Sequence, residues 1–293
     1  MTKITLNFFL LFCLTLIYSP KSLALSKLGH QLVCQLSYEN LSANTKEKVD
    51  TLVNSLPKQQ QNIIKKYNHL SKKTTVTFAH ACTWPDAIKK QKQYRKFSSW
   101  HYVNVPRNAQ QILPKHCKKN CLPQAIIVHQ QQLKKTTSIK EKREALLFLS
   151  HWLGDIHQPL HISFKSDLGG NKSRIDNKLG KCENLHWYWD ECLLKFNNKN
   201  KKSLLNELKP LWQAPTNDAW QPASVWLWAN ESYKLTRSAD LKYCKLNKAK
   251  QCQPYTNDKV IINKPYAEKF HPILKQQIAK AAIRLTQVLE SSF

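Results

Sequence analysis

Histidine and aspartate recur in six short clusters, and a fold that uses them together must bring six distant segments to one place. The clusters are Leu25-Ser-Lys-Leu-Gly-His30, Trp84-Pro-Asp86, Trp100-His101-Tyr102, His151-Trp-Leu-Gly-Asp155, Gln158-Pro-Leu-His161 and His186-Trp-Tyr-Trp-Asp190. They supply five histidines and three aspartates, and a terminus freed by a cut before Leu25 would be a ninth ligand. Nine such donors exceed the needs of one metal and suit three zinc ions. A site of this kind is typical of phosphodiester hydrolysis.

Two of the clusters have the spacing of paired ligands on a helix. His151 and Asp155 are four residues apart, as are His186 and Asp190, so each pair leaves one helix face. A proline shortly after Asp155 should end or kink the first helix, which puts the next histidine one turn further on. A single pair is more often a structural hydrogen bond. The repeated pair favours a metal site, because a buried aspartate and histidine are costly when unpaired.

The remaining histidines have no assigned ligand role. His157 lies between two candidate ligands, so it either supports a ligand or is an ordinary structural histidine. We expect the others at the surface: His69, His80, His116, His129 and His271.

The first 24 residues have the pattern of a secretory signal. Lys3 precedes a mostly apolar run over Ile4–Tyr18, and Ser22-Leu-Ala24 offers small residues for cleavage before Leu25. The run is short for a membrane span, although an uncleaved anchor is the alternative. We therefore expect an exported chain, secreted or periplasmic, whose residues 25–293 form one domain.

Eight cysteines follow the signal, and an even number in an exported chain indicates disulfides. Zinc thiolate sites are the alternative, but the chain has no CxxC pair. Cys117 with Cys121 and Cys244 with Cys252 could close small loops. Bridges among the other four would brace the candidate site: Cys34, Cys82, Cys182 and Cys192.

The formal net charge of +27 attracts polyanions, either nucleic acid or an anionic membrane. A solvated, lysine-rich surface without such a role is equally consistent with it. Apolar spacing predicts a mostly α fold. The expected helices are 28–41, one starting at Trp84-Pro-Asp86, 144–157, 184–194 and 265–289, with a loop at 167–171 and short helices and loops over 197–264.

The run Gly154-Asp-Ile-His-Gln-Pro-Leu-His161, followed by Gly169-Gly-Asn171, resembles the S1/P1 nucleases, a family of secreted zinc-dependent enzymes. The resemblance extends from Leu25 to the helix around residues 281–285. It implies a single-domain, phospholipase C-like helical fold with a trinuclear zinc site. It also implies a monomer without stable membrane association, which cleaves single-stranded RNA and DNA to 5′-phosphate products and acts on 3′-nucleotides.

The resemblance also implies a role for each site residue. One zinc would bind Asp86, His101, His151 and a shared Asp155. A second would bind Asp155, His30 and the amine and carbonyl of Leu25, and a third His161, His186 and Asp190. The implied catalytic residues are Asp86, Lys89 and Asp155, with Lys89 at the phosphate, and the implied substrate contacts are Tyr102, Asn104 and Asn171. Cys34 and Cys82 match a pair that is bridged in some members.

Two positions depart from the family pattern. Leu25 stands where members usually begin with tryptophan, so the backbone donors persist and the indole packing does not. Asn104 stands where many members have an aspartate that contacts the base, while Tyr102 keeps the aromatic ring that stacks on it.

Two other functions are compatible with parts of the sequence. A zinc phospholipase C would act on phospholipid head groups, but that family has glutamate at the position of Asp190 and different spacings. A non-catalytic basic binder of nucleic acid or heparin would explain the charge and would leave the full set of candidate ligands without a purpose.

Overall fold

The computed structural model describes residues 25–117, 120–213, 220 and 224–293. The expected signal segment and its cleavage site lie outside these residues. Among the described residues, no helix combines the length and apolar character needed to cross a membrane.

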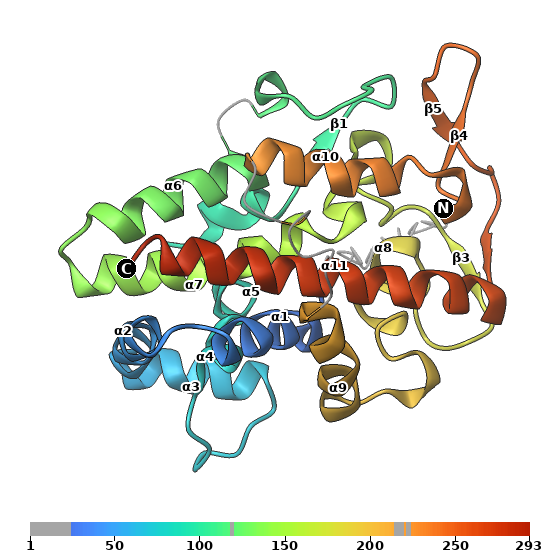
Figure 1. Cartoon of the computed structure of the whole chain (residues 1–293). Helices are drawn as coiled ribbons and strands as arrows, with labels where there is room; N and C mark the ends of the chain where they lie inside the picture. The colour runs from blue at the N-terminus through green and yellow to red at the C-terminus, as the bar shows by residue number, and fades with distance from the viewer. Residues whose placement is uncertain (1–24, 118–119, 214–219, 221–223) are drawn as a thin grey trace, which may run out of the picture.

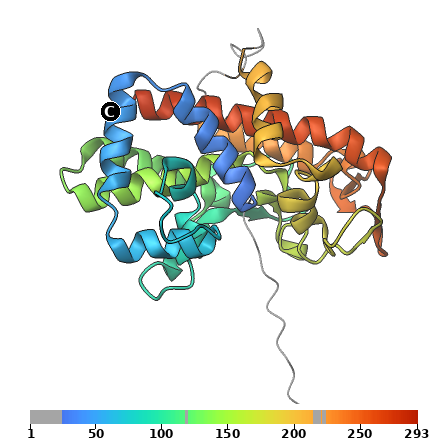
Figure 2. The ribbon, with the colours of Figure 1, turned by 90° about the horizontal axis from the view of Figure 1, so that it is seen from below.

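Four helices form the frame that positions the site (Figure 1). They are α1 (Lys27–Glu39), α6 (Leu122–Lys135), α7 (Ile139–Ile156) and α11 (Lys264–Glu290). The long α11 packs on both α1 and α7, and α6 lies along α7. Figure 2 shows that α1 starts near the middle of the molecule and runs outward to α2 (Ala43–Asn54), so its first residues lie deep in the fold.

Helix α7 is the central element, and its sequence explains why. The Ser138 hydroxyl caps its start by accepting a hydrogen bond from the Glu141 amide. Every residue from Ala145 to Ile156 is buried, so the helix is enclosed on all sides. It ends three residues before Pro159, because proline cannot donate the next helical hydrogen bond. The interior therefore has to accommodate the histidine and aspartate that α7 carries.

The other segments are short and surround this frame. The remaining α-helices are α3 (Lys58–Tyr67), α4 (Phe78–Ala81), α5 (Trp84–Ile88), α8 (Leu185–Trp187), α9 (Lys201–Trp212) and α10 (Val225–Thr236). The 3₁₀ segments are η1 (Arg95–His101), η2 (Pro114–His116), η3 (Pro159–His161), η4 (Lys165–Asp167), η6 (Phe196–Asn198) and η8 (Ala239–Leu241), and η5 (Tyr188–Cys192) is a π-helical turn.

Three two-stranded pairs complete the described fold. Strands β1 (Val103–Val105) and β2 (Ile162–Phe164) pair in parallel, as do β3 (Ile175–Asn177) and β6 (Val260–Ile262). Strands β4 (Cys244–Leu246) and β5 (Cys252–Pro254) form an antiparallel hairpin. The β1–β2 pair joins the end of η1 to the end of η3, so it holds two of the His/Asp clusters side by side.

The mostly α class is confirmed, and the expected helices are present with shifted ends. The helix expected over 144–157 starts at Ile139, and the one expected over 184–194 is α8 followed by the π-helical turn η5. The interpretation of 197–264 was wrong in part. It contains two twelve-residue helices, α9 and α10, and three strands rather than only short helices and loops.

All eight cysteines within residues 25–293 form disulfides: Cys34–Cys82, Cys117–Cys121, Cys182–Cys192 and Cys244–Cys252. The two expected small loops are confirmed, and so is the pair that the family resemblance implied. The Cys34–Cys82 bridge ties α1 to the residue after α4, and Cys182–Cys192 spans the segment that holds His186 and Asp190.

Candidate metal centre

Eight side chains from six segments converge in the interior. They come from α1, α5, η1, α7, η3 and the α8–η5 turn, and none is more than 6% exposed: His30, Asp86, His101, His151, Asp155, His161, His186 and Asp190. Three sets of three have donor atoms within 4.8 Å of one another: His30, Asp86 and His151; His101, His151 and Asp155; and His161, His186 and Asp190. All eight residues come from the six sequence clusters described above. Each set combines imidazole with carboxylate, a donor combination that zinc favours.

The four side chains assigned to the first ion, which we call the first group, are Asp86, His101, His151 and Asp155. His101 Nδ1 lies 3.0 Å from Asp155 Oδ2 and 3.2 Å from His151 Nε2. The distance from His151 Nε2 to Asp155 Oδ2 is 3.4 Å, and Asp86 Oδ1 is 3.9 Å from both histidine nitrogens. Ligands held tetrahedrally at about 2.0–2.1 Å from zinc are about 3.3–3.4 Å apart. His101, His151 and Asp155 therefore have the spacing of ligands to one ion, and Asp86 lies about half an ångström further from the two histidines.

The second group shares Asp155 with the first. His30 Nε2 is 3.3 Å from Asp155 Oδ1, the carboxylate oxygen that faces away from the first group. Both atoms are fully buried and neither makes a hydrogen bond. Buried polar atoms are rarely left without a partner, so a buried imidazole nitrogen and carboxylate oxygen that face each other are suited to bind a cation. One carboxylate is thus placed to serve two neighbouring ions.

The third group lies where η3 meets the α8–η5 turn. His186 Nε2 is 3.3 Å from Asp190 Oδ2, and His161 Nε2 is 3.6 Å from Asp190 Oδ1. The two Nε2 atoms and Asp190 Oδ2 are buried without a hydrogen-bond partner. All three unpaired atoms are potential metal donors, so this group also fits an ion.

Backbone carbonyls orient three of the histidines toward the groups. His151 Nδ1 donates to the Cys82 carbonyl at 2.8 Å, and His186 Nδ1 donates to the Gly169 carbonyl at 2.7 Å. His161 Nδ1 is 2.6 Å from the His101 carbonyl. A proton fixed on Nδ1 leaves the Nε2 lone pair free, which is the usual arrangement of a metal-binding histidine.

The charge of the site also favours cations. Burial lowers the pKa of His151 to about 3, so this imidazole is neutral at physiological pH. Burial alone would also lower the pKa of His161, but Asp155 and Asp190 raise it to about 9. Burial would raise the pKa of Asp155, yet the surrounding histidines hold it well below its usual value. Ionised carboxylates thus attract positive charge into the interior.

Three polar residues support the carboxylates from outside the groups. Lys89 Nζ is 2.9 Å from Asp86 Oδ1, as expected for a lysine one turn further along the helix. Tyr67 and Gln158 were not predicted. The Tyr67 hydroxyl donates to Asp86 Oδ2 at 3.4 Å, and Gln158 Nε2 donates to Asp190 Oδ1 at 2.6 Å. Gln158 stands in a cluster already noted, whereas Tyr67 gives no signal in the sequence.

Leu25 lies in the interior next to the second group. Its side chain is 2% exposed and packs over Gly29 of its own segment and Gly154 of α7. The amide of the next residue, Ser26, donates to the Asp190 carbonyl at 3.0 Å. The start of the described chain is therefore anchored between the groups, although leucine replaces the tryptophan that the family pattern leads one to expect.

Gly154→Ala should disturb one group selectively. A Cβ at this position would lie 2.7 Å from His30 Nδ1, too close for the ring to stay in place. The ring is stacked on His151 at 3.7 Å between centroids, so it has little room to move. We expect activity to fall by about tenfold or more with reduced zinc content, measured by turnover and elemental analysis.

Gly180→Ala is the matched control for that substitution. The nearest atoms to its added Cβ would be 4.0 Å away, so this variant should keep full activity and zinc. Equal turnover and zinc content in the two variants would contradict the proposed effect on His30.

The three expected substrate residues lie at the edge of the centre. Tyr102, directly after His101, is 39% exposed, so its ring is accessible to a base. Asn104 on β1 has a buried Oδ1 without a hydrogen-bond partner, next to Gly169. Asn171 donates to the Leu168 carbonyl at 2.8 Å, which closes the turn that contains the two glycines.

Three of the histidines without a ligand role are buried, and for two of them we expected a surface position. His157 is a satisfied structural histidine: Nδ1 donates to the Leu153 carbonyl at 2.7 Å, and Nε2 is 2.8 Å from an Arg284 nitrogen. The surface placement of His129 and His271 was wrong, because they are 2% and 6% exposed. His129 is enclosed by aromatic rings, including those of Phe148 and Trp152.

Comparison with known proteins gives a consistent result over the same residues. The family model described as S1/P1 Nuclease matches residues 25–293. Endonuclease 3 of Arabidopsis thaliana is 27% identical, with 90% of this chain and 87% of the relative covered. Endonuclease 1 of the same plant is 30% identical, with 92% and 87% covered. Nuclease S1 of Aspergillus oryzae is 25% identical, with 76% and 82% covered.

Proposed function

This chain belongs to the S1/P1 nuclease family, and on that premise we propose that it hydrolyses single-stranded RNA and DNA to products with 5′-phosphate ends. It is a zinc-dependent hydrolase of phosphodiester bonds. Activity as a 3′-nucleotidase follows from the same chemistry, because a 3′-phosphomonoester presents the same leaving oxygen. The observation that carries the proposal is the convergence of eight buried histidines and aspartates in three close sets, with the Asp155 carboxylate 3.0–3.4 Å from His30, His101 and His151.

We assign one zinc ion to each group. Asp86, His101, His151 and Asp155 would hold the first ion, and Asp155, His30 and the Leu25 terminus the second. His161, His186 and Asp190 would hold the third. Bound zinc supplies Lewis acidity, which activates water at neutral pH and stabilises negative charge on phosphate oxygens. The unpaired buried nitrogens and carboxylate oxygens support this assignment.

The protein side chains around the ions would bind and orient the substrate. Lys89 reaches from Asp86 toward solvent with a 24% exposed side chain, so its charge can meet a phosphate. The exposed Tyr102 ring offers a stacking surface for a splayed base, worth roughly 1–3 kcal/mol. Stacking of this kind requires an unpaired base, which accounts for single-strand preference. Asn171 holds the turn whose Gly169 carbonyl orients His186.

Export would complete the site. Four disulfides fit an oxidising compartment, and cleavage before Leu25 would free the amine that the second ion needs. We therefore propose that the active form is residues 25–293, acting as a secreted or periplasmic monomer of one domain without stable membrane association.

One experiment tests the function against its alternatives. The mature protein should contain three zinc ions per chain and release acid-soluble nucleotides from single-stranded RNA and DNA. Mass spectrometry of the products should find the phosphate at the 5′ end. Removal of zinc by a chelator should abolish release, and added zinc should restore it. Release of phosphocholine instead of nucleotides would favour a phospholipase C, and a metal-free protein that binds without cleavage would favour the basic binder.

Asn104→Asp should change base preference with little change in zinc content. The free, buried Oδ1 of Asn104 can accept a hydrogen bond, and the amide can also donate one. A carboxylate only accepts, so the ranking of turnover among the four 3′-nucleotides should shift. Asn108→Asp, the same change at an exposed position beyond β1, should leave the ranking unaltered. An unchanged ranking in the Asn104 variant would mean that this residue does not contact the base.

A further inference from the structure

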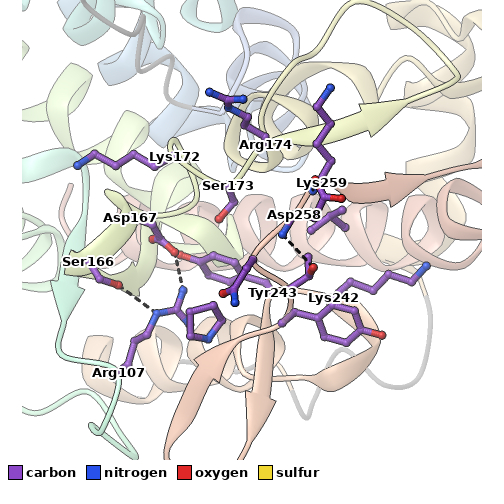
Figure 3. A pocket seen from close by; sticks show the side chains of 15 residues that line it. Arg107, Ser166, Asp167, Lys172, Ser173, Arg174, Lys242, Tyr243, Asp258 and Lys259 are labelled. Atoms are coloured by element: carbon purple, nitrogen blue, oxygen red, sulfur yellow. Dashed lines mark hydrogen bonds and ion pairs between the residues drawn. The ribbon is translucent and has the colours of Figure 1, made fainter.

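A hollow lies beside the turn that orients His186. It has a volume of about 400 Å³ and opens between that turn, the β4–β5 hairpin and the segment leading into β6 (Figure 3). We call it the basic pocket, because its lining has five cations and two carboxylates: Arg107, Lys172, Arg174, Lys242 and Lys259, with Asp167 and Asp258. It is separate from the buried His/Asp groups and open to solvent.

Most of the positive charge in the basic pocket is not neutralised by neighbours. Arg107 donates to Asp167 Oδ2 at 2.5 Å and to the Ser166 hydroxyl at 3.0 Å. Within the described part of the chain, Lys172, Arg174 and Lys259 form no ion pair with a carboxylate. All three are exposed. The pocket therefore keeps a net positive charge that a ligand anion could meet.

The strand register places two of these cations next to each other. Ile175 of β3 pairs with Val260 of β6, and the Val260 amide donates to the Arg174 carbonyl at 3.0 Å. Arg174 and Lys259 are thus neighbours at the start of parallel strands, and Figure 3 shows their side chains extending in the same direction. Like charges at adjacent positions are destabilising. An anion bound between them would remove that repulsion.

Hydrogen bonds connect the wall of the basic pocket to the metal centre. Asp167 Oδ1 accepts from the Tyr243 hydroxyl at 2.5 Å and from the Gly170 amide at 3.1 Å. The adjacent Gly169 carbonyl accepts from His186 Nδ1. The same turn therefore forms one side of the pocket and one side of the third group.

Chain geometry limits how far apart the two sites are. Lys172 directly follows Asn171, and Arg107 follows Asn104 by three residues. Three residues span at most about 11 Å, so the nearest lining residues of the pocket lie within about 11 Å of the proposed substrate contacts Asn104 and Asn171.

An aromatic ring adds a second kind of recognition. Tyr255, between β5 and β6, lines the basic pocket and is 41% exposed. Exposed aromatic rings next to cationic grooves are how proteins bind single strands without reading the sequence. Cations for a phosphate and a ring for a base together match the chemistry of one nucleotide.

We propose that the basic pocket is a subsite for a nucleotide one step beyond the two that flank the cleaved bond. Lys172, Arg174 and Lys259 hold its phosphate, and Tyr255 stacks on its base. The inference rests on the proposed single-strand nuclease function. It predicts that a longer strand gains affinity from this pocket and that a dinucleotide too short to reach it does not.

The test compares two variants with equal loss of charge. The pocket variant is Lys172→Gln, Arg174→Gln and Lys259→Gln. The control is Lys134→Gln, Lys135→Gln and Lys140→Gln, three exposed lysines at the junction of α6 and α7, away from the pocket in Figure 1. The probe is a fluorescent single strand of about nine phosphorothioate-linked nucleotides, whose slow hydrolysis allows binding to be measured. Zinc content and circular dichroism establish that both variants fold.

The pocket variant should bind the probe about tenfold more weakly at low salt, and the slope of log affinity against log salt should fall by about 2. The ratio of kcat/KM for an oligonucleotide to that for a dinucleotide should fall similarly. The control should change each quantity by less than about twofold. Equal losses in both variants would overturn the proposal, because they would mean that the charge acts diffusely over the surface.

Tyr255 provides an independent arm of the test. Tyr255→Ala should weaken probe binding about fivefold or more, while Tyr255→Phe, which keeps the ring, should bind like the wild type. Unchanged binding in the alanine variant would show that Tyr255 does not stack on a base.

The subsite and the nuclease function can be judged separately. If the wild-type protein cleaves no strand but the pocket variant binds the probe more weakly, the subsite stands and the nuclease function fails. If the wild-type protein cleaves strands and the pocket variant binds the probe normally, the subsite is rejected.

Discussion

Asp155→Asn is expected to abolish hydrolysis and to lower zinc content by more than one ion per chain. Oδ2 of this carboxylate lies 3.0 Å from His101 Nδ1, and Oδ1 lies 3.3 Å from His30 Nε2. Asparagine has nearly the same shape, but its amide nitrogen has no lone pair for a metal, and the negative charge is lost. Elemental analysis and nucleotide release measure the two effects.

Asp176→Asn is the matched control, because its carboxylate is at the surface and pairs with Lys178. That variant should keep normal zinc and turnover. An Asp155 variant with normal zinc content and near-normal turnover would refute the assignment. Activity of the wild-type protein should also fall in acid, since histidines bind metal only when neutral.

The parts of the centre fixed by local geometry were predictable from the sequence. The helical period sets the relation between His151 and Asp155, and the proline that ends α7 places His161 just beyond them. The prediction that Asp86 and His101 lie next to that helix came from the family resemblance. No local pattern brings η1 next to α7, because that contact depends on β1 pairing with β2 across 59 residues of sequence.

The incorrect predictions have physical causes. His129 is followed by three glutamines, and a lone histidine beside polar residues is usually exposed. Here its ring packs with aromatic neighbours, and Nδ1 is 2.8 Å from the Ala125 carbonyl, which satisfies it in the core. Helix α9 is rich in lysine, and only Leu204 and Leu208 are buried. A strip that narrow gives little apolar periodicity, so the sequence did not distinguish it from a loop.

The position of Leu25 changes how its departure from the family pattern should be understood. The side chain contributes packing against Gly29 and Gly154, and both glycines leave the space that it fills. Its proposed role toward the metal depends only on backbone atoms, which leucine and tryptophan share. Leucine in place of tryptophan therefore changes the packing against Gly29 and Gly154 and leaves the proposed backbone donors unchanged.

A form that keeps one residue before Leu25 is expected to lose most of its activity. An α-amine has a pKa of about 7.7–8, so its neutral form is available to a metal near neutral pH, whereas an amide nitrogen is a poor donor. The extra residue would also need room, since Leu25 is 2% exposed and the next amide is bonded to Asp190. Turnover should fall by about 100-fold, with zinc content reduced at the second site.

Two controls separate the lost amine from general damage. The same residue added after Phe293 should have no effect, because that end is only partly buried and distant in sequence from every candidate ligand. Leu25→Trp in the mature form should retain activity, since the backbone donors are unchanged. Full activity with extra residues before Leu25 would show that the terminus is not a ligand. The second ion would then have only His30 and Asp155 from the protein, too few for a stable zinc site, and the number of ions in the proposal would have to be revised.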